Sequence, residues 1–220
     1  MIEISTSILT VEKKELINKL YEIETAKTDY LHIDVMDGKF VPKNTYEQMI
    51  EYAKYAKQTS MLPLDVHLMI ENVKEGIDEF GSLEPEIITF HLEAMKDKEE
   101  VLETINYIRK YNCKVGLSIK PNTKLCEILE YLPNVYMVLI MTVEPGLGGQ
   151  KLIPETIEKV KELKKYIEDN NLDTFIEVDG GINLDTIEEV KIAGADIFVA
   201  GTAIINAEKP NEIIKEFKKI

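Results

Sequence analysis

The chain lacks an apolar run long enough to cross a bilayer, and it lacks the hydrophobic core of a signal peptide. The run that begins at Val135 is far shorter than the about 20 residues that a membrane-spanning helix needs. Charges at Glu3, Glu12, Lys13 and Lys19 interrupt the N-terminal stretch, where a signal peptide would be apolar. We therefore expect a protein with no membrane partner.

Cysteine is also scarce, and the sequence contains only Cys113 and Cys126. Their spacing fits neither a zinc site nor a redox motif, so we expect ordinary core or helix residues. Reduced thiols, together with the missing signal, favour the cytoplasm as the compartment.

Positive charge is in deficit. The 26 lysine and arginine residues are outnumbered by 40 aspartate and glutamate residues, which gives a formal net charge of −14 at pH 7. This balance argues against nucleic acid and anionic membrane surfaces as partners. The negative net charge does not exclude a small anionic ligand, because backbone N–H groups bind phosphate without any lysine.

Short β-branched runs alternate with amphipathic stretches along the whole sequence. We predict strands at residues 2–9, 30–36, 64–70, 86–91, 114–119, 135–142, 174–179 and 195–200. Helices are predicted at residues 12–25, 46–57 and 98–111, after Asn72, from the Asn122-Thr123 cap to Tyr131, over the Ile157, Val160, Leu163 and Ile167 repeat, from an N-cap at Asn183 to Ala193, and at the C-terminus. Eight strand–helix units predict an α/β protein with a single (β/α)8 barrel, one domain over residues 1–220. An open doubly wound sheet is the alternative.

Polar side chains recur at the predicted strand ends, where such barrels carry their chemistry. One face of the second strand holds His32, Asp34 and Met36, and the third strand repeats the pattern with Asp65, His67 and Met69. The seventh strand adds Glu177 and Asp179 on one face.

Two imidazoles and two carboxylates from three strands are a plausible ligand set for a divalent metal. Hydrogen-bonded core histidines are the structural alternative. Asp65 and Glu177, one layer deeper, either orient ligands or form structural pairs. His91 has no obvious partner except Glu93, and we place it outside the ligand set.

Methionines and glycines add two further patterns at the same ends of the strands. Met36, Met69 and Met141 are either core filling or an apolar wall that excludes water from a reactive intermediate. Glycine-rich loops follow the last three strands and expose backbone N–H groups suited to phosphate, with Ser7 as a hydroxyl from the first strand. These loops contain Gly146, Gly148, Gly149, Gly180, Gly181, Gly201 and Thr202.

A metal beside two carboxylates, with a phosphate site across the barrel mouth, limits the chemistry. One carboxylate can remove a proton next to a carbonyl while another returns one, and the metal can stabilise the enediolate. The pattern therefore predicts an isomerase or epimerase acting on a phosphorylated sugar.

The sequence resembles the ribulose-phosphate 3-epimerase family over essentially its whole length. The matching segments are residues 7–9, 32–38, 40–42, 65–69, 141–146, 148–150, 178–182 and 199–204. This resemblance implies metal-dependent epimerisation at C3 of D-ribulose 5-phosphate to D-xylulose 5-phosphate, a reaction of the pentose phosphate pathway. It also implies one divalent metal, usually zinc with iron or manganese as substitutes, and a homo-oligomer, either a dimer or a hexamer.

The resemblance assigns roles residue by residue. The metal ligands fall on His32, Asp34, His67 and Asp179, and the acid–base pair falls on Asp34 and Asp179. Substrate contacts fall on Ser7, His67, Met36, Met69, Met141, Gly148, Gly149, Gly180, Gly181, Gly201 and Thr202. The sequence departs from the family pattern at Thr6, usually proline, at Leu147, commonly aromatic, and at Thr202, commonly serine. These departures concern loop closure and sugar recognition, and none touches the ligand set.

Other readings remain. D-allulose 6-phosphate 3-epimerase shares the chemistry on a substrate one carbon longer. Metal-free barrels such as phosphate-binding decarboxylases share the last glycine loops but need a strand-end Asp-x-Lys, and this sequence has no such lysine. A catalytically silent phosphosugar-binding barrel is the non-enzyme alternative.

Overall fold

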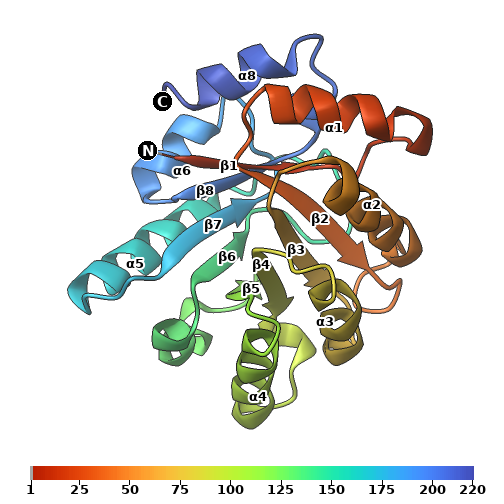
Figure 1. The fold of residues 1–220 in the computed structure, drawn as a ribbon. Coiled ribbons are helices and arrows are strands. Elements are labelled where there is room, and N and C mark those ends of the chain that lie inside the picture. Colours follow the sequence, from red (N-terminus) through yellow and green to blue (C-terminus); the bar gives the residue numbers. More distant parts are fainter. Residues whose placement is uncertain (1) are drawn as a thin grey trace.

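Eight parallel strands close into a barrel in the computed structural model, which describes residues 2–220 (Figure 1). The strands are β1 (Glu3–Ser7), β2 (Tyr30–Met36), β3 (Leu64–Met69), β4 (Ile87–His91), β5 (Lys114–Ile119), β6 (Met137–Met141), β7 (Phe175–Asp179) and β8 (Ile197–Ala200). Each strand pairs with its sequence neighbours, and β1 pairs with β8 through the register Ile4↔Phe198. This closure confirms the predicted (β/α)8 barrel and excludes the open sheet.

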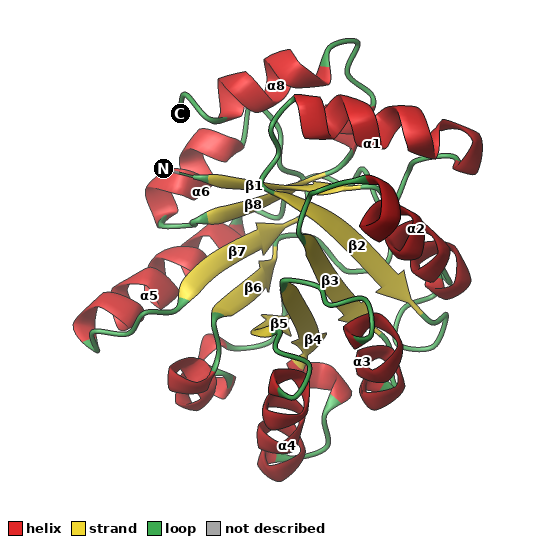
Figure 2. Ribbon diagram, viewed as in Figure 1, coloured by secondary structure: helices red, strands yellow, loops and turns green. Residues whose placement is uncertain are grey.

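Helices surround the barrel on its outside (Figure 2). They are α1 (Leu16–Thr25), α2 (Tyr46–Thr59), α3 (Val73–Gly81), α4 (Lys98–Arg109), α5 (Glu155–Asp169), α6 (Ile187–Ala193), α7 (Thr202–Ile205) and α8 (Pro210–Phe217). The predicted stripe of α5 is buried, because a 3.6-residue period brings Ile157, Val160, Leu163 and Ile167 to one face. No helix within residues 2–220 is long and apolar enough to cross a membrane.

The segment between β5 and β6 does not form the predicted α-helix. It contains two 3-10 helices, η3 (Leu125–Glu127) and η4 (Leu129–Asn134), and Pro133 lies inside the second. Proline has no N–H and its ring clashes with the carbonyl four residues earlier, so an α-helix cannot run through it. The N-cap of η3 is Lys124 rather than Asn122, whose side-chain amide donates to Glu144 Oε1.

Two other helix starts differ from prediction. The helix expected from residue 12 begins as the 3-10 turn η1 (Lys13–Glu15) and becomes α-helical at Leu16. The N-cap of α6 is Thr186 rather than Asn183. Asn183 instead closes the turn before the helix, since its side chain accepts the N–H of Asp185 at 2.9 Å.

The side chains of each strand alternate between two cores, as period two requires. Outward residues of β2 such as Leu31, Ile33 and Val35 pack in the large cluster between the barrel and the helices. Inside the barrel, an apolar layer from the even-numbered strands consists of Tyr30, Ile87, Met137 and Ile197. These four residues lie at or near the N-terminal ends of their strands, so this end of the barrel is closed by apolar packing and the polar side chains collect toward the other end.

Candidate functional site

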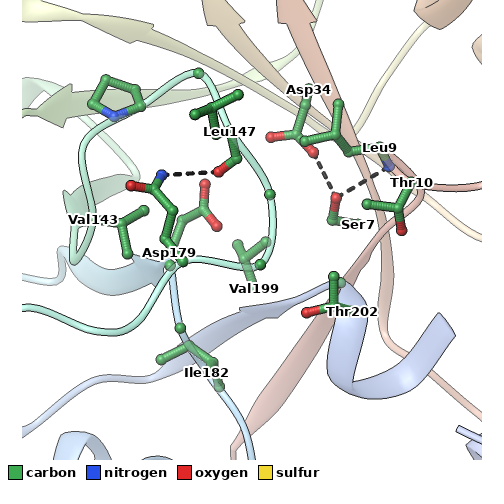
Figure 3. A pocket seen from close by; sticks show the side chains of 18 of the residues that line it. Ser7, Leu9, Thr10, Asp34, Val143, Leu147, Asp179, Ile182, Val199 and Thr202 are labelled. Carbon is green, nitrogen blue, oxygen red and sulfur yellow. Dashed lines mark hydrogen bonds between the residues drawn. The ribbon is translucent and has the colours of Figure 1, made fainter. Parts of the chain in front are cut away.

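A cavity of about 350 Å³ opens at the C-terminal ends of the strands. Its walls come from β1, β2, β3, β6, β7 and β8 and from the loops that follow several of these strands. Figure 3 shows Asp34 and Ser7 on one side of the pocket and Asp179 on another. Nearly all of the predicted substrate-contact residues line this cavity, namely Ser7, Met36, Met69, Met141, Gly148, Gly149, Gly180, Gly181, Gly201 and Thr202.

His32, Asp34, His67 and Asp179 converge at the base of this cavity. One potential ligand atom from each residue can be chosen so that all four atoms lie within 4.8 Å of one another. Asp34 Oδ1 lies 3.5 Å from His32 Nε2 and 4.0 Å from His67 Nδ1. Asp179 Oδ2 lies 3.7 Å from His67 Nδ1. The structure thus brings together the four residues that the sequence analysis grouped.

The two imidazole nitrogens that face the aspartates fit a metal site. His32 Nε2 and His67 Nδ1 are buried and have no hydrogen-bond partner among residues 2–220. Buried polar atoms are almost always paired, so two such atoms beside carboxylates need an explanation. Tetrahedral zinc with bonds of about 2.0–2.1 Å separates its ligand atoms by about 3.3 Å, close to the distances here. The donor set therefore fits a divalent cation.

Opposite electrostatics act on the two histidines. Burial alone would lower the pKa of His32, but the carboxylates of Asp65 and Asp34 outweigh burial and hold that pKa well above its ordinary value. Burial and the neighbouring rings of His91 and His32 hold the pKa of His67 well below its ordinary value. Without a metal, His32 therefore holds a proton more tightly than His67 does.

The two aspartates also differ in their surroundings. Asp34 accepts a hydrogen bond from Ser7 Oγ at 2.6 Å. Burial and the negative charge of Asp34 raise the pKa of Asp179 to about 7. A carboxyl group with a raised pKa beside a second carboxyl group is an arrangement that acid–base chemistry uses.

Beneath the cluster lies a second group of buried polar residues. Asp65 Oδ2 lies 2.6 Å from His32 Nδ1 and accepts from Ser5 Oγ at 2.7 Å. Glu177 is fully buried, and neither of its carboxyl oxygens has a hydrogen-bond partner within the described chain. Burial and the adjacent Asp65 charge hold the pKa of Glu177 well above its ordinary value. Asp65 therefore orients His32, whereas Glu177 holds its proton more tightly than an ordinary glutamate does.

The three methionines do not form one continuous wall. Met36 and Met69 pair in register and pack with Val41, while Met141 packs separately against Leu139 and Val143. All three line the cavity. The apolar lining is thus divided into two patches that belong to different sides of the barrel.

Backbone groups line the rim after β6, β7 and β8. Gly149 and Gly181 have φ values of +74° and +69°, a conformation that favours glycine. No acceptor in the described part of the chain contacts the N–H of either residue. These N–H groups therefore have no hydrogen-bond partner within residues 2–220, and both residues line the cavity.

Two residues outside the predicted set organise the site. Asp37 accepts the N–H groups of Lys39, Phe40 and Glu71, so it connects the loops after β2 and β3. His91 contacts His67, with 2.9 Å between their Nε2 atoms, and its Nδ1 lies 3.1 Å from Glu93 Oε2. The contact with Glu93 was expected from the sequence, whereas the contact with His67 was not.

His32 and His67 are fully buried and do not line the cavity themselves. They lie beside the two aspartates, whose side chains are 6% and 18% exposed. The aspartates therefore lie between the imidazoles and the cavity.

Fold and site together define a (β/α)8-barrel protein with a candidate metal centre and a glycine-rich rim. A profile of the ribulose-phosphate 3 epimerase family matches residues 3–205, and the chain belongs to this family. The match confirms the predicted family and the prediction of an epimerase enzyme.

Named relatives span nearly the whole chain. The ribulose-phosphate 3-epimerase of Methanocaldococcus jannaschii is 41% identical over 219 residues, covering 100% of this chain and 91% of that protein. The protein of the same name from Mycobacterium leprae is 38% identical over 98% of this chain and 93% of its own length. The Escherichia coli protein of that name is 35% identical over 98% of this chain and 94% of its own length.

More distant solved structures share the fold alone. The 3-hexulose-6-phosphate synthase of Salmonella typhimurium superposes with a TM-score of 0.75 at 13% identity, covering 99% of this chain and 97% of that one. Thiamine phosphate pyrophosphorylase from Pyrococcus furiosus superposes with a TM-score of 0.64 at 16% identity, covering 99% of this chain and 94% of that one.

Proposed function

We propose that the protein catalyses metal-dependent epimerisation at C3 between D-ribulose 5-phosphate and D-xylulose 5-phosphate. The observation that carries this proposal is the cluster itself. Two carboxylates and two unpartnered imidazole nitrogens lie together at the base of a cavity that has a glycine-rich rim. Membership of the epimerase family and the names of the relatives support the same reaction.

The ligands we assign are His32 Nε2, His67 Nδ1 and one oxygen from each of Asp34 and Asp179. A bound divalent ion, for which we favour zinc with iron or manganese as substitutes, supplies positive charge that polarises the substrate carbonyl and stabilises the enediolate. The cavity-lining residues of the strands include no lysine, which disfavours a metal-free decarboxylase chemistry.

Proton transfer is assigned to Asp34 and Asp179. One carboxylate takes the proton from C3, the C–H electron pair moves toward the carbonyl oxygen, and a planar enediolate forms. The other carboxyl group, on the opposite side of the sugar plane, returns a proton to C3 and inverts its configuration. In the metal-free site, burial and the neighbouring Asp34 raise the pKa of Asp179 to about 7, so this carboxyl group holds a proton more tightly than an ordinary aspartate.

The remaining residues bind substrate and exclude water. Ser7 Oγ orients Asp34, and the N–H groups of Gly149 and Gly181 bind the phosphate. Gly148, Gly180, Gly201 and Thr202 complete the phosphate site. Met36, Met69 and Met141 keep apolar surface next to the enediolate, so that water does not protonate it from the wrong side.

The test is epimerisation of D-ribulose 5-phosphate in D2O by the zinc-loaded protein, with deuterium at C3 followed by NMR. The wild type should form D-xylulose 5-phosphate and incorporate deuterium at C3, and prolonged chelation should abolish both until zinc is returned. Asp34→Asn and Asp179→Asn should each lose both signals. Full activity in either variant would overturn the two-aspartate assignment. A wild type that binds D-ribulose 5-phosphate but never exchanges the C3 proton would instead be a catalytically silent phosphosugar-binding barrel.

Substrate length is tested with the same assay. We expect kcat/KM to be higher for the pentulose phosphate than for D-allulose 6-phosphate. The reverse order would assign the protein to the hexulose reaction.

A further inference from the structure

The rings of His67 on β3 and His91 on β4 meet through their Nε2 edges. Their centroids are 5.0 Å apart, the planes meet at 24°, and the two Nε2 atoms are separated by 2.9 Å. A hydrogen bond between two imidazole nitrogens requires a proton on one and a lone pair on the other. The groups around the pair decide which ring donates.

The carboxylate of Glu93 determines which nitrogen of His91 carries the proton. Its Oε1 accepts the N–H of Lys120 at 2.7 Å and the hydroxyl of Thr123, and its Oε2 lies 3.1 Å from His91 Nδ1. An ionised carboxylate can only accept, so His91 Nδ1 carries the proton and His91 Nε2 is left with a lone pair.

His67 must then donate from Nε2, which leaves the lone pair of His67 on Nδ1. That atom lies 3.7 Å from Asp179 Oδ2 and 4.0 Å from Asp34 Oδ1, inside the ligand cluster. Each hydrogen bond in the series Glu93–His91–His67 therefore fixes the next one.

We propose that His91 and Glu93 are positioning residues that hold His67 in the Nε2–H tautomer and so present its Nδ1 to the metal. This inference rests on the proposed metal-dependent function. His32 presents its other nitrogen to the cluster. Asp65 Oδ2 lies 2.6 Å from His32 Nδ1, which leaves Nε2 to face the proposed metal. Each imidazole thus has its own carboxylate, Asp65 directly and Glu93 through His91.

The series Glu93–His91–His67, here called the relay, is shielded from water on its outer side. His67 and His91 are fully buried, and the Phe40 ring lies 4.9 Å from that of His91. Lys120 Nζ lies 3.9 Å from the centroid of the Phe40 ring, which places a cation over this cover. Because both rings are fully buried, bulk solvent does not reach the pair to substitute for a lost partner of His67.

Nitrogen NMR on the full chain reads the tautomer directly. The sequence has three histidines, and all three belong to this network, so their ring signals are easily assigned. We expect long-range 15N–1H spectra of the metal-free and zinc-loaded wild type to show His67 with its proton on Nε2. Zn2+ affinity is measured separately, by competition with a chromophoric chelator.

Glu93→Gln is the decisive variant because it keeps the shape of the side chain. The amide oxygen should stay with Lys120 and Thr123, so the NH2 group faces His91 Nδ1 and drives the His91 proton to Nε2. His67 should then carry its proton on Nδ1 when metal-free, and Zn2+ affinity should fall about 10- to 100-fold. A role in packing alone predicts no change in either measurement.

His91→Leu and a matched control complete the design. His91→Leu should weaken Zn2+ binding by a similar factor, and adding Glu93→Gln to it should cause no further loss, since the relay is already broken. Asp29→Asn makes the same carboxylate-to-amide change at a residue that binds Ile4 N–H and Lys218, and its Zn2+ affinity should stay unchanged.

An unchanged His67 tautomer with unchanged affinity in Glu93→Gln would overturn the inference, as would a wild type with the proton on Nδ1. A wild type that shows the expected tautomer and affinity but no epimerisation would count against the proposed function alone.

Discussion

Ser7 Oγ donates a hydrogen bond to Asp34 Oδ2 over 2.6 Å, while the N–H of Leu9 donates to the same Ser7 oxygen at 3.3 Å. The second contact occupies a lone pair of the hydroxyl and leaves its proton directed at the carboxylate. The end of β1 thereby fixes the orientation of a side chain on β2. Figure 3 shows both contacts at the edge of the pocket.

Ser7→Ala should therefore lower kcat/KM for ribulose 5-phosphate by roughly 10- to 100-fold, because a hydrogen bond to a charged group contributes about 1.5–3 kcal/mol. Thr6→Val is the matched control, since Thr6 contacts Thr28 Oγ1 rather than the cavity. This control should reduce the free energy of unfolding and leave kcat/KM unchanged. Equal kcat/KM values for Ser7→Ala and the wild type would contradict the role given to Ser7.

Asp179 should make the metal-free protein less stable as the pH rises. Its pKa is raised to about 7 by burial and by Asp34, whereas an ordinary aspartate has 3.8. Between these values the folded state holds a proton that the unfolded chain has lost, so the free energy of unfolding falls as pH increases. Relative to Asp179→Asn, the wild type should lose up to about 1.4 kcal/mol per pH unit in this window. Urea denaturation at pH 5 and pH 7 measures the free energy of unfolding of Asp179→Asn minus that of the wild type. We expect this difference to rise with pH, and a difference that stays constant or falls would refute the assignment.

Glu177→Gln should change stability little at low pH and stabilise the protein at higher pH. Burial and the Asp65 charge hold the pKa of Glu177 well above its ordinary value of 4.5, so the folded state keeps this acid neutral. The amide of the variant would be neutral at every pH, whereas the wild-type glutamate gives up its proton in the unfolded chain first. The free energy of unfolding of the variant, minus that of the wild type, should rise from pH 4.5 upward. A difference that is flat across the same range would show that Glu177 is ionised in the folded protein.

Gly181→Ala should cost much more stability than Gly149→Ala, although both residues have positive φ. A Cβ at residue 149 would meet only Thr202 Cγ2 at 3.7 Å, so the cost should be about 1–2 kcal/mol of backbone strain. A Cβ at residue 181 would lie 2.3 Å from the backbone N of Leu152, which forces the loop to move. Denaturant titration of the two variants checks this order, and equal costs would contradict it.

Local pattern alone determined a large part of this protein. Period-two alternation placed His32, Asp34 and Met36 on the inner face of β2, because a strand has only two faces and the choice propagates along it. The same rule placed Asp179 above Glu177 on β7, and the alternation of strands with helical stretches predicted the barrel. These inferences needed only near neighbours in the sequence.

Only the tertiary structure decided which polar groups meet. The contact of His67 with His91 depends on the register between β3 and β4, and the pairing of Glu93 with Lys120 and Thr123 joins segments about 30 residues apart. The separation of Met141 from Met36 and Met69 depends on the places of β6, β2 and β3 around the closed barrel. Register, strand order and rotamer follow from the packing of the whole barrel, and no local pattern encodes them. The sequence therefore identified the four residues of the candidate metal site, and the fold supplied the hydrogen bonds to the other nitrogen of each histidine.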